Sequence, residues 1–588
     1  MSGIYGMVQL DEAPVTREKL QPLAASMAGW GPDGHGQWHG GNAGLGFLSL
    51  HTTPESLHDC MPASLRAAPH LFITADARID NRGELFDALH VPDAGRTRTP
   101  DSSLILLAYE RWGSECVKRL LGDFAFGIWD ASERLLFCAR DPMGCRPFYY
   151  HPGVRTFLFA SDIRGVLASL ESPRLNEPLL AAYLQMRTYH ARKTQTFYEN
   201  VLKLPAGHTL LLAGGALRLN RYWSPEDVRE RPPAGEGELR DLFRQAVECR
   251  LRSAFTVGAH LSGGIDSSTV TLEAARLLRT QGRQLRTFSW SPPPENGQCR
   301  THEYARINAV CRQEELECEY FPVTAPSLLR VMQRDFTVEP IELLPREENV
   351  QLRAEALGIR VILSGWGGDE ALTHWWQRNH GGGLREWFLS RLPDSLYSKV
   401  HRNPFMRYAS PCIHPDFAAR YVQEARRLQG PPLRRLRDAR ATILRLLDLG
   451  YLPRRMEDWA VSGAQHRIVY SYPLLDRRLV EFALGIQPGR PPRRQLFLSC
   501  LADLLPREID WTADDREPAT LAALEKEHIA AHMQWLSGGR ELPEAARPFI
   551  DPGRIRHSIE TAERTGSLHS LQGVKEAIGC YAIKRLKQ

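Results

Sequence analysis

The sequence predicts two joined folds, a layered β-sheet domain of the α+β class followed by an α/β domain built on a doubly wound parallel sheet. The first observation is a series of short alternating apolar segments, separated by Gly and Pro turns, in residues 1–223. The second is a change, after residue 238, to buried strands that alternate with long helical patterns. The third is the length of 588 residues, which allows two or more separate hydrophobic cores.

The predicted strands of the N-terminal domain alternate apolar and polar residues, as expected for sheets with one buried face. They are Gly3–Val8, Gly44–Leu50, Leu71–Ile79, Ala125–Trp129, Leu135–Ala139, Thr156–Ala160 and Thr209–Leu212. Helical patterns occur at Ser102–Trp112 and Pro178–Leu184. Many strands with few helices predict antiparallel sheets that pack face to face.

A polar segment rich in Pro and Gly, residues 224–238, is predicted to link the two domains. The C-terminal domain is predicted over residues 239–588. It begins with a helix at Leu239–Arg250 and continues with parallel strands that end near His260, Trp290 and Leu363. Residues 371–460 form a predicted helical insertion dense in Arg and aromatic residues, which fits a solvated helical cap as well as an enlarged substrate wall.

The composition is that of a soluble globular protein, with 43% apolar and 24% charged residues. The net charge of +5 is small for this length and gives no indication of a nucleic-acid partner. We find no apolar run long enough to span a membrane and no pattern of a signal peptide. The 11 cysteines are scattered without paired spacing, which predicts reduced thiols in a cytoplasmic protein.

The segment His260–Ser268, H-L-S-G-G-I-D-S-S, lies between a predicted strand and a predicted helix. Gly263 and Gly264 allow a tight turn that brings backbone N–H groups close to an anion, and the helix N-terminus adds partial positive charge. Two glycines alone would fit an ordinary turn, but S-G-G-x-D-S-S is far more restrictive. It lacks the G-K-[ST] of a Walker A loop, so a kinase-type P-loop is excluded. Asp266 would repel phosphate directly, which predicts that it binds Mg²⁺.

A second Gly-rich segment, S-G-W-G-G-D-E at residues 364–370, also follows a predicted strand and carries the carboxylate of Asp369. Taken alone, G-G-D-E would equally be a helix cap. Paired with the first segment, it predicts that Asp266 and Asp369 bind one Mg²⁺ over the β- and γ-phosphates of ATP. The predicted ATP and pyrophosphate contacts are Leu261, Ser262, Gly263, Gly264, Ile265, Asp266, Ser267, Ser268, Phe288, Ser289, Gly365, Trp366 and Gly367.

These motifs resemble those of a known family. S-G-G-x-D-S-S is similar to the pyrophosphate loop of ATP pyrophosphatases, which cleave ATP between the α and β phosphates. Four N-terminal segments resemble the glutaminase domain of asparagine synthetase B-type enzymes: G-D-F-A-F-G-I-W-D (122–130), A-R-D-P-M-G-C-R-P-F-Y-Y (139–150), F-A-S-D-I-R (159–164) and L-P-A-G-H (204–208). The resemblance covers nearly the whole chain. It implies an Ntn-hydrolase-type N-terminal domain and an ATP-pyrophosphatase C-terminal domain.

The residues with which that family hydrolyses glutamine are altered in this chain. The family's catalytic cysteine follows the initiator methionine, and Ser2 stands there. Phe47 replaces the arginine that binds the glutamine carboxylate, and Asp76-Ala77-Arg78 replaces an N-G-E triplet. Serine can serve as an N-terminal nucleophile, but a carboxylate at the oxyanion position would destabilise the tetrahedral intermediate. We therefore expect a degenerate, structural N-terminal domain.

The proton-transfer residues of the family are also altered. A glutamate usually lies four residues before the proline of a P-[FL]-L-D segment, and here that position is Val469. Tyr470 and Tyr472 are candidate bases, because a Tyr–Glu pair has this role in related β-lactam-forming synthetases. Arg516 is the candidate replacement for the family's lysine, and it could supply charge but could not accept a proton.

S-G-W-G-G-D-E is similar to the version found in lasso peptide macrolactam synthetases, whereas asparagine-forming members usually carry an acidic residue at the position of Trp366. That resemblance implies adenylation of an Asp or Glu side chain in a leaderless precursor peptide, then attack by the peptide's N-terminal amine. It also implies a leader-binding protein and a leader peptidase as partners. The alternatives are an ammonia-dependent asparagine synthetase, a small-molecule β-lactam synthetase and, in a different class, a non-catalytic scaffold.

Overall fold

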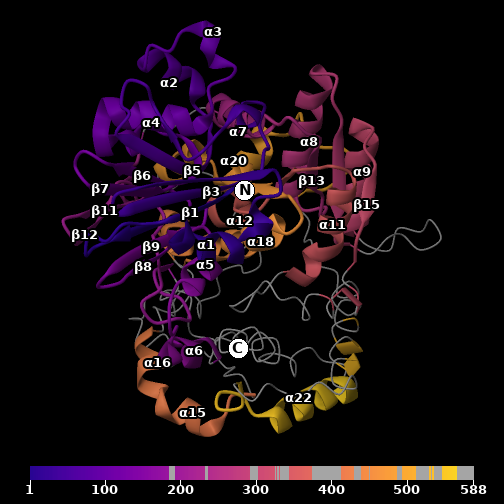
Figure 1. Ribbon diagram of the computed structural model, residues 1–588. Coiled ribbons are helices and arrows are strands. Elements are labelled where there is room, and N and C mark those ends of the chain that lie inside the picture. Colours follow the sequence, from indigo (N-terminus) through magenta and orange to yellow (C-terminus); the bar gives the residue numbers. More distant parts are fainter. Residues whose placement is uncertain are drawn as a thin grey trace.

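The computed structural model describes residues 1–184, 193–231, 236–291, 302–322, 344–373, 412–428, 439–448, 450–486, 493–511 and 546–565, with a few further positions between these ranges. Figure 1 shows the N-terminal sheets, in indigo and purple, beside the parallel sheet of the C-terminal domain. Each domain has its own type of sheet, as the sequence predicts.

Two six-stranded sheets form the centre of the N-terminal domain, and every strand pair in them is antiparallel. The first has the order β10-β8-β9-β1-β3-β2, with β1 at Gly3–Gln9, β2 at Gly34–Gly40, β3 at Ala43–Ser49, β8 at Tyr149–Pro152, β9 at Thr156–Ala160 and β10 at Leu202–Lys203. The second has the order β12-β11-β7-β6-β5-β4, with β4 at Ala63–Ser64, β5 at Leu71–Ile79, β6 at Gly122–Asp130, β7 at Leu135–Arg140, β11 at His208–Ala213 and β12 at Ala216–Arg221.

The two sheets pack face to face, because alternate side chains of both are apolar and buried. Phe47 of β3, Phe126 of β6 and Phe159 of β9 lie in this shared core. The helices α1 (Arg17–Ser26) and α5 (Ile163–Ala168) cover the first sheet, and α4 (Asp101–Trp112) covers the second. The result is a layered α/β/β/α domain, which confirms the predicted class.

The C-terminal domain is built on a parallel sheet with the order β15-β14-β13-β16-β17. Its strands are β13 at Val257–His260, β14 at Leu285–Ser289, β15 at Cys318–Tyr320, β16 at Val361–Leu363 and β17 at Val469–Ser471. The connecting helices are α7 (Glu236–Arg250), α8 (Ile265–Thr280), α9 (His302–Glu314), α11 (Leu344–Ala356) and the short α12 (Gly368–Ala371). Because the chain first adds strands on one side of β13 and then on the other, the order reverses between β13 and β16. This is the topology of a doubly wound sheet, as predicted.

Several elements differ from the sequence prediction in extent. The helix α7 begins at Glu236, inside the predicted linker, and not at Leu239 as predicted. The strands β2, β8, β12, β15 and β17 were not among the predicted strands. They are short or rich in Gly and polar residues, so pairing with a neighbour defines them rather than their own periodicity.

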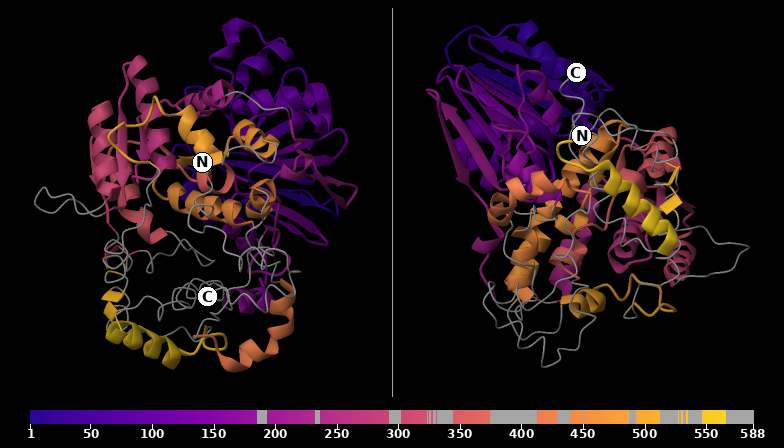
Figure 2. Two further views of the ribbon diagram at one scale, coloured as in Figure 1. Left: turned by 180° about the vertical axis from the view of Figure 1, so that it is seen from behind. Right: turned by 90° about the horizontal axis from the view of Figure 1, so that it is seen from below.

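The remaining described helices are α6 (Glu177–Leu184), α15 (Pro415–Arg420), α16 (Val422–Leu428), α17 (Ala439–Asp448), α18 (Tyr451–Ala464), α19 (Arg477–Gly485), α20 (Arg493–Cys500) and α22 (Pro552–Thr565). Figures 1 and 2 show α6, α15, α16 and α22 grouped away from the parallel sheet. The described parts of residues 371–460 are mainly helical. Residues 374–411 of that insertion and the predicted charge donor Arg516 lie outside the described residues.

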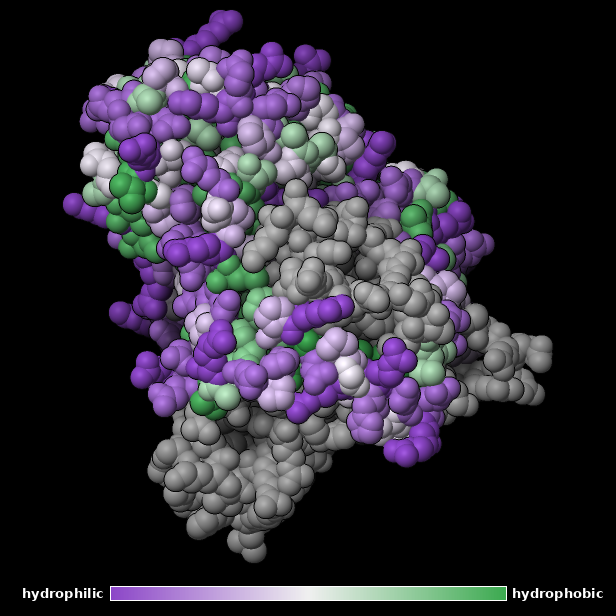
Figure 3. Space-filling view, turned by 60° about the horizontal axis from the view of Figure 1, so that its bottom comes forward, coloured by the Kyte–Doolittle hydropathy of each residue, from purple (hydrophilic) through white to green (hydrophobic). Residues whose placement is uncertain are grey.

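The face shown in Figure 3 has a mostly hydrophilic described surface, with apolar residues in small separate groups. Within the described part of the chain, none of the helices has the length and apolar character needed to span a membrane.

Candidate active site

The two Gly-rich segments flank the point at which the strand order of the parallel sheet reverses. Residues 261–268 follow β13, and residues 364–370 follow β16. These two strands are hydrogen-bonded neighbours, so both segments leave the same edge of the sheet side by side. The carboxyl edge at such a reversal is where doubly wound proteins bind ligands.

The first loop is held in shape by its own serines. The backbone N–H of Ser262 donates to Ser267 Oγ at 3.1 Å, and the two hydroxyls lie 2.9 Å apart. Gly263 has a φ of +77°, and a Cβ there would lie 2.6 Å from the carbonyl oxygen of Glu303 in α9. The helix α8 then begins at Ile265 without a side-chain cap among the described residues. Its first N–H groups and its partial positive charge are therefore suited to an anion.

Glycines allow the two loops to pack directly on each other. A Cβ on Gly365 would lie 2.5 Å from the backbone nitrogen of Ser267, and one on Gly368 would lie 2.3 Å from Cγ of Asp266. Since real Cβ atoms do not approach other atoms so closely, neither position has room for a side chain. The second loop thus brings its carboxylate to the carboxylate of the first.

Asp266 and Asp369 form a pair of like charges at this contact. The hydroxyl of Thr373 lies 3.1 Å from Asp266 Oδ2 and 3.4 Å from Asp369 Oδ1, so it can donate to either carboxylate. Burial, followed by the negative charge of Asp369, raises the pKa of Asp266 well above its usual range. Arg494 at the start of α20 opposes this shift. The surroundings of Asp266 therefore disfavour its ionised form.

This arrangement fits a divalent cation. Oδ1 of Asp266 and Oγ of Ser268 are buried and have no hydrogen-bond partner among the described residues. A buried carboxylate oxygen without a partner is unfavourable, and Mg²⁺ takes oxygen ligands of this kind. Asp266 and Asp369 would hold the ion.

Trp366 of the second loop stacks against a cation from another helix. The guanidinium of Arg455, in α18, lies 3.2 Å from the centre of the Trp366 ring. Gly367, the next residue, has a φ of +95° and contacts Leu475, since a Cβ there would lie 2.3 Å from the leucine Cγ. Trp366 therefore packs against a helix-borne arginine, a contact that the sequence did not predict.

The other predicted nucleotide contacts lie at the same edge of the sheet. Phe288 and Ser289 end β14, and the Phe288 carbonyl accepts a hydrogen bond from the backbone N–H of Leu261 at 2.8 Å. The structure thus brings together Leu261, Ser262, Gly263, Gly264, Ile265, Asp266, Ser267, Ser268, Phe288, Ser289, Gly365, Trp366, Gly367 and Asp369. It gives no position for Arg516, and the roles of all these residues stay predictions.

Tyr470, a predicted base, lies in β17 at one end of the sheet order, and its side chain is buried. Its hydroxyl donates to Glu347 Oε1 at 2.7 Å, and Gln351 donates to the same hydroxyl at 2.9 Å. Glu347 also accepts hydrogen bonds from Trp290 Nε1 and lies 2.8 Å from His260 Nε2. Burial, then the Glu347 carboxylate, raises the pKa of Tyr470 well above its usual range. A phenol that stays protonated in this way suits a structural donor better than a base.

Tyr472, the second predicted base, is also buried, and its hydroxyl has no hydrogen-bond partner among the described residues. Burial raises its pKa well above the usual range, and the thiol of Cys145 adds to the effect. Arg455 acts in the opposite direction. Like Tyr470, this phenol keeps its proton near neutral pH, so its assignment as a base stays a prediction without support from its surroundings.

The segments that would form a glutaminase site in the related family contact one another within this chain. The backbone N–H of Ser2 donates to Asp76 Oδ1 at 3.2 Å, and the Ser2 hydroxyl accepts a hydrogen bond from the Leu50 N–H at 3.1 Å. Nε of Arg146 lies 3.8 Å from Asp76 Oδ2, which balances the charge of the carboxylate. Phe47 is buried in the core between the sheets, where it cannot bind a carboxylate.

Several residues of the C-terminal site had no recognisable pattern in the sequence. Glu347 lies in α11 and Tyr470 in β17, and their separation of 123 residues along the chain hides the contact. Arg455 lies in an arginine-rich segment, and no sequence pattern distinguishes it from the neighbouring arginines. Thr373 could have been found, because it lies one helical turn after Asp369, where i, i+4 side chains meet.

The arrangement defines a two-domain protein with a candidate phosphate site at the reversal point of a parallel sheet. A family model described as a glutamine amidotransferase domain matches residues 1–223, and one described as asparagine synthase matches residues 238–575. The second match spans more than half of the chain, so the chain belongs to the asparagine synthase family.

Two relatives show how similar this chain is in sequence to other members of the family. A putative asparagine synthetase [glutamine-hydrolyzing] 2 of Methanocaldococcus jannaschii is 29% identical over 293 residues, which are 46% of this chain and 56% of the relative. Asparagine synthetase [glutamine-hydrolyzing] 3 of Bacillus subtilis is 28% identical over 295 residues, or 49% of this chain and 48% of the relative. The chain thus spans about half the length of these curated relatives.

Among solved structures, the allosteric regulatory enzyme of purine biosynthesis is 14% identical, with a TM-score of 0.28. The match covers 55% of this chain and 81% of that chain.

Proposed function

We propose that this protein forms an amide bond within a ribosomally made peptide, with ATP as the energy source. An Asp or Glu side chain of the leaderless precursor attacks the α-phosphate of ATP and releases pyrophosphate. The N-terminal amine of the same peptide then attacks the acyl-adenylate and releases AMP, which closes the macrolactam ring of a lasso peptide.

The loop at residues 261–268 and the carboxylates of Asp266 and Asp369 support a reaction in which ATP activates the carboxylate of the substrate. A carboxylate does not react with an amine at useful rates in water, so it must first be activated. The loop at residues 261–268 and the N-terminus of α8 offer backbone N–H groups to the leaving pyrophosphate. Asp266 and Asp369 would hold Mg²⁺, which would neutralise charge on the leaving group. Thr373 keeps the two carboxylates in place.

The contacts of Ser2 and Asp76 support an amine of the peptide, and not ammonia, as the nucleophile. This is the observation that carries the proposal. Ser2 is hydrogen-bonded to Asp76 and Leu50, and Arg146 forms an ion pair with Asp76. A carboxylate at the position expected of an oxyanion donor opposes hydrolysis of glutamine. Because ammonia would then not be made within the chain, an amine already present on the substrate is the more suitable nucleophile.

The Trp366 version of the second loop favours a peptide substrate by its resemblance to lasso peptide synthetases. A free N-terminal amine is required, so a leader peptidase must act before this protein. A leader-binding protein would bring the precursor to that peptidase. We propose both as partners of the pathway.

The test is incubation of the protein with ATP, Mg²⁺ and a candidate leaderless core peptide. We expect the peptide to lose the mass of one water while AMP and pyrophosphate appear in equal amounts. A core peptide with an acetylated N-terminus should support ATP–pyrophosphate exchange without cyclisation, because it lacks only the nucleophile. A peptide with the acceptor Asp or Glu changed to its amide should support neither step.

A second candidate is an ammonia-dependent asparagine synthetase, which the similarity to relatives named asparagine synthetase favours. Aspartate and ammonia replace the peptide in the same assay. Formation of asparagine, without a change in the peptide, would establish that candidate in place of the macrolactam synthetase. Absence of exchange with every acceptor would instead indicate a non-catalytic scaffold.

A further inference from the structure

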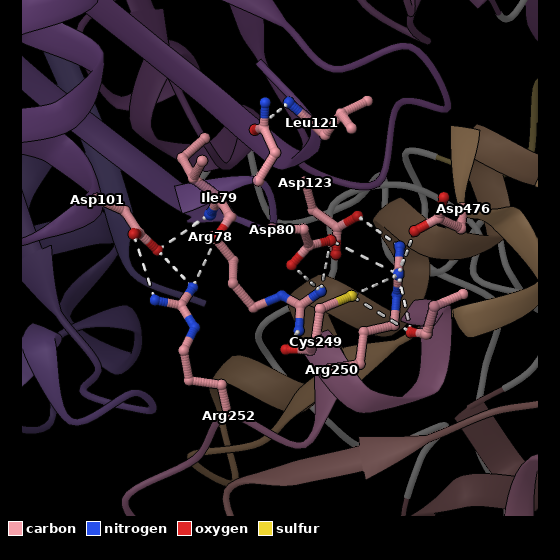
Figure 4. Close-up of polar contacts among 12 residues, drawn as sticks. Arg78, Ile79, Asp80, Asp101, Leu121, Asp123, Cys249, Arg250, Arg252 and Asp476 are labelled. Atoms are coloured by element: carbon pink, nitrogen blue, oxygen red, sulfur yellow. Dashed lines mark hydrogen bonds and ion pairs between the residues drawn. The ribbon is translucent and has the colours of Figure 1, made fainter. Parts of the chain in front are cut away.

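A buried network of charges joins the N-terminal domain to the C-terminal domain (Figure 4). Its central residue is Arg250, at the end of α7. Nη1 of Arg250 lies 2.8 Å from Asp476 Oδ2 and 3.6 Å from Asp80 Oδ2, and Nη2 lies 3.7 Å from Asp123 Oδ1. Asp80 and Asp123 belong to the N-terminal domain, whereas Asp476 follows β17. One buried arginine therefore contacts carboxylates of both domains.

The network is balanced in charge without a ligand. Arg78 lies 2.8 Å from Asp80, and Arg478 lies 2.9 Å from Asp476. Burial opposes ionisation of Asp476, but Arg250 and Arg478 hold its pKa below the usual range. Asp80, Cys249 and Asp476 lie close enough together to suggest a metal site. Since arginines already pair with these carboxylates, we assign no metal there.

The network continues from Asp476 to the second phosphate loop. The Asp476 side chain accepts a hydrogen bond from the backbone N–H of Arg478 at 3.0 Å and so caps α19. The preceding residue, Leu475, packs against Gly367, where there is no space for a Cβ. Two residues further along that loop is Asp369. A short chain of contacts thus runs from the N-terminal domain through Arg250, Asp476, Leu475 and Gly367 toward the carboxylate pair.

We propose that Arg250 and Asp476 are positioning residues for the nucleotide site, and that the N-terminal domain completes this site through Asp80 and Asp123. The domain then has a role that does not depend on glutamine hydrolysis. Ion pairs of the interface fix Asp476, which fixes Leu475 against Gly367 and sets the path of the loop that carries Asp369. This inference rests on the proposed function, because its effect on activity is measured as adenylation.

The alternative is that the interface ion pairs only hold the two domains together. A second arginine of the interface provides a matched control for this alternative. Arg252 lies two residues after Arg250 and binds the same domain: its Nη2 lies 2.9 Å from Asp101 Oδ2, and its Nη1 lies 3.2 Å from Glu55. Figure 4 shows the two arginines pointing to separate carboxylate groups. Arg252 makes no described contact with Asp476. Only Arg250 should therefore affect the phosphate loop.

The test compares Arg250→Lys with Arg252→Lys in the full chain. Lysine keeps the positive charge but lacks the planar fork that reaches several carboxylates at once. We measure KM and kcat for ATP in ATP–pyrophosphate exchange, together with hydrogen–deuterium exchange of residues 361–373. For Arg250→Lys we expect the KM for ATP to rise by roughly 10-fold, because small misplacements of a site have effects of this size, with faster deuterium uptake in the loop. For Arg252→Lys we expect neither change.

Equal effects of both variants on KM and on deuterium uptake would show a merely adhesive interface and overturn the proposal. An unchanged loop in Arg250→Lys would overturn it as well. If Arg250→Lys does not fold, Asp123→Asn tests the same link from the N-terminal domain and should give the same loop-specific change. If the wild-type protein shows no exchange with any acceptor, the proposed function fails, while deuterium uptake of the loop still decides whether the positioning network exists.

Discussion

The surroundings of Ser2 and the candidate nucleotide site around Asp266 differ in how the chain treats a buried carboxylate. In the first, Asp76 has a positive partner in Arg146 and a backbone N–H donor in Ser2. In the second, Asp266 faces Asp369, whose negative charge adds to the effect of burial and raises the pKa of Asp266. Oδ2 of Asp76 and Oδ1 of Asp266 are both buried with no hydrogen-bond partner among the described residues, so the sign of the neighbouring charge is what distinguishes the two carboxylates. A protein compensates a buried charge internally where no ligand binds, whereas a ligand site keeps the charge for the ligand.

The same contrast separates the interface network from the nucleotide site. Around Arg250, three carboxylates meet arginines. The pKa values of Asp123 and Asp476 are lowered despite burial, because arginines lie beside them, whereas burial raises the pKa of Asp80. Around Asp266, burial and a second carboxylate raise the pKa. Neighbouring arginines therefore favour the ionised form of a buried carboxylate, whereas a neighbouring carboxylate disfavours it.

The largest expected effect is that of Asp266→Asn. Loss of a metal ligand at the leaving group should lower ATP–pyrophosphate exchange by at least about 1,000-fold, because electrostatic stabilisation by a metal is worth several kcal/mol. The matched control is Asp76→Asn, which makes the same substitution in the compensated pocket and should leave the exchange rate unchanged. Substantial exchange by Asp266→Asn would show that the metal assignment is wrong.

The dependence of Mg²⁺ binding on pH tests the charge difference directly. Because burial and Asp369 raise the pKa of Asp266, protons compete with the metal nearer to neutral pH than for an ordinary carboxylate. Lowering the pH favours the protonated form, so the apparent Mg²⁺ affinity should fall by up to about 10-fold for each pH unit below that pKa and recover as pH rises. Titration of exchange activity with Mg²⁺ over the pH range in which the protein stays folded measures this, and an affinity that does not fall at the acidic end of that range would contradict it.

A smaller effect is expected from Trp366→Leu, which removes the ring that Arg455 stacks on. A cation–π contact contributes about 0.5–2 kcal/mol, so the KM for ATP should rise by roughly 2- to 30-fold. Trp366→Phe keeps an aromatic face and should lie between leucine and the wild type. If leucine and phenylalanine behave alike, the stacking with Arg455 has no part in nucleotide binding.

The smallest expected effect is that of Ser2→Cys, which restores the family's nucleophile alone. Asp76 still occupies the expected oxyanion position, and Phe47 is still buried between the sheets. We therefore expect no glutamate release from glutamine above the level of Ser2→Ala. Measurable glutaminase activity in Ser2→Cys would mean that a single substitution separates this pocket from a working one.

Much of the fold could be predicted because its periodicities are local. The strands at β1, β5 and β6 alternate clearly, and both phosphate loops are continuous segments with Gly at positions that need it. The strands β15 and β17 could not be predicted in this way. Each is three residues long and exists because a longer neighbour provides hydrogen-bond partners.

The assignment of a base shows the limit of reasoning from spacing. Tyr470 was selected for its place near the P-L-L-D segment, but its chemistry depends on Glu347, which lies far away in sequence. That carboxylate raises the pKa of the phenol and keeps it as a donor. Desolvation and the identity of a neighbour determine proton affinity, and neither is visible in a linear pattern.

The sequence by itself determined the two sheet types, the two Gly-rich loops and the absence of the residues that the related family uses for glutamine hydrolysis, because each depends on residues that are close together in the chain. Only the tertiary structure decided that Asp266 and Asp369 meet, that Arg455 stacks on Trp366, and that Arg250 contacts carboxylates of both domains. These contacts join residues far apart in the chain, and their strength comes from burial and charge that exist only after the sheets have packed.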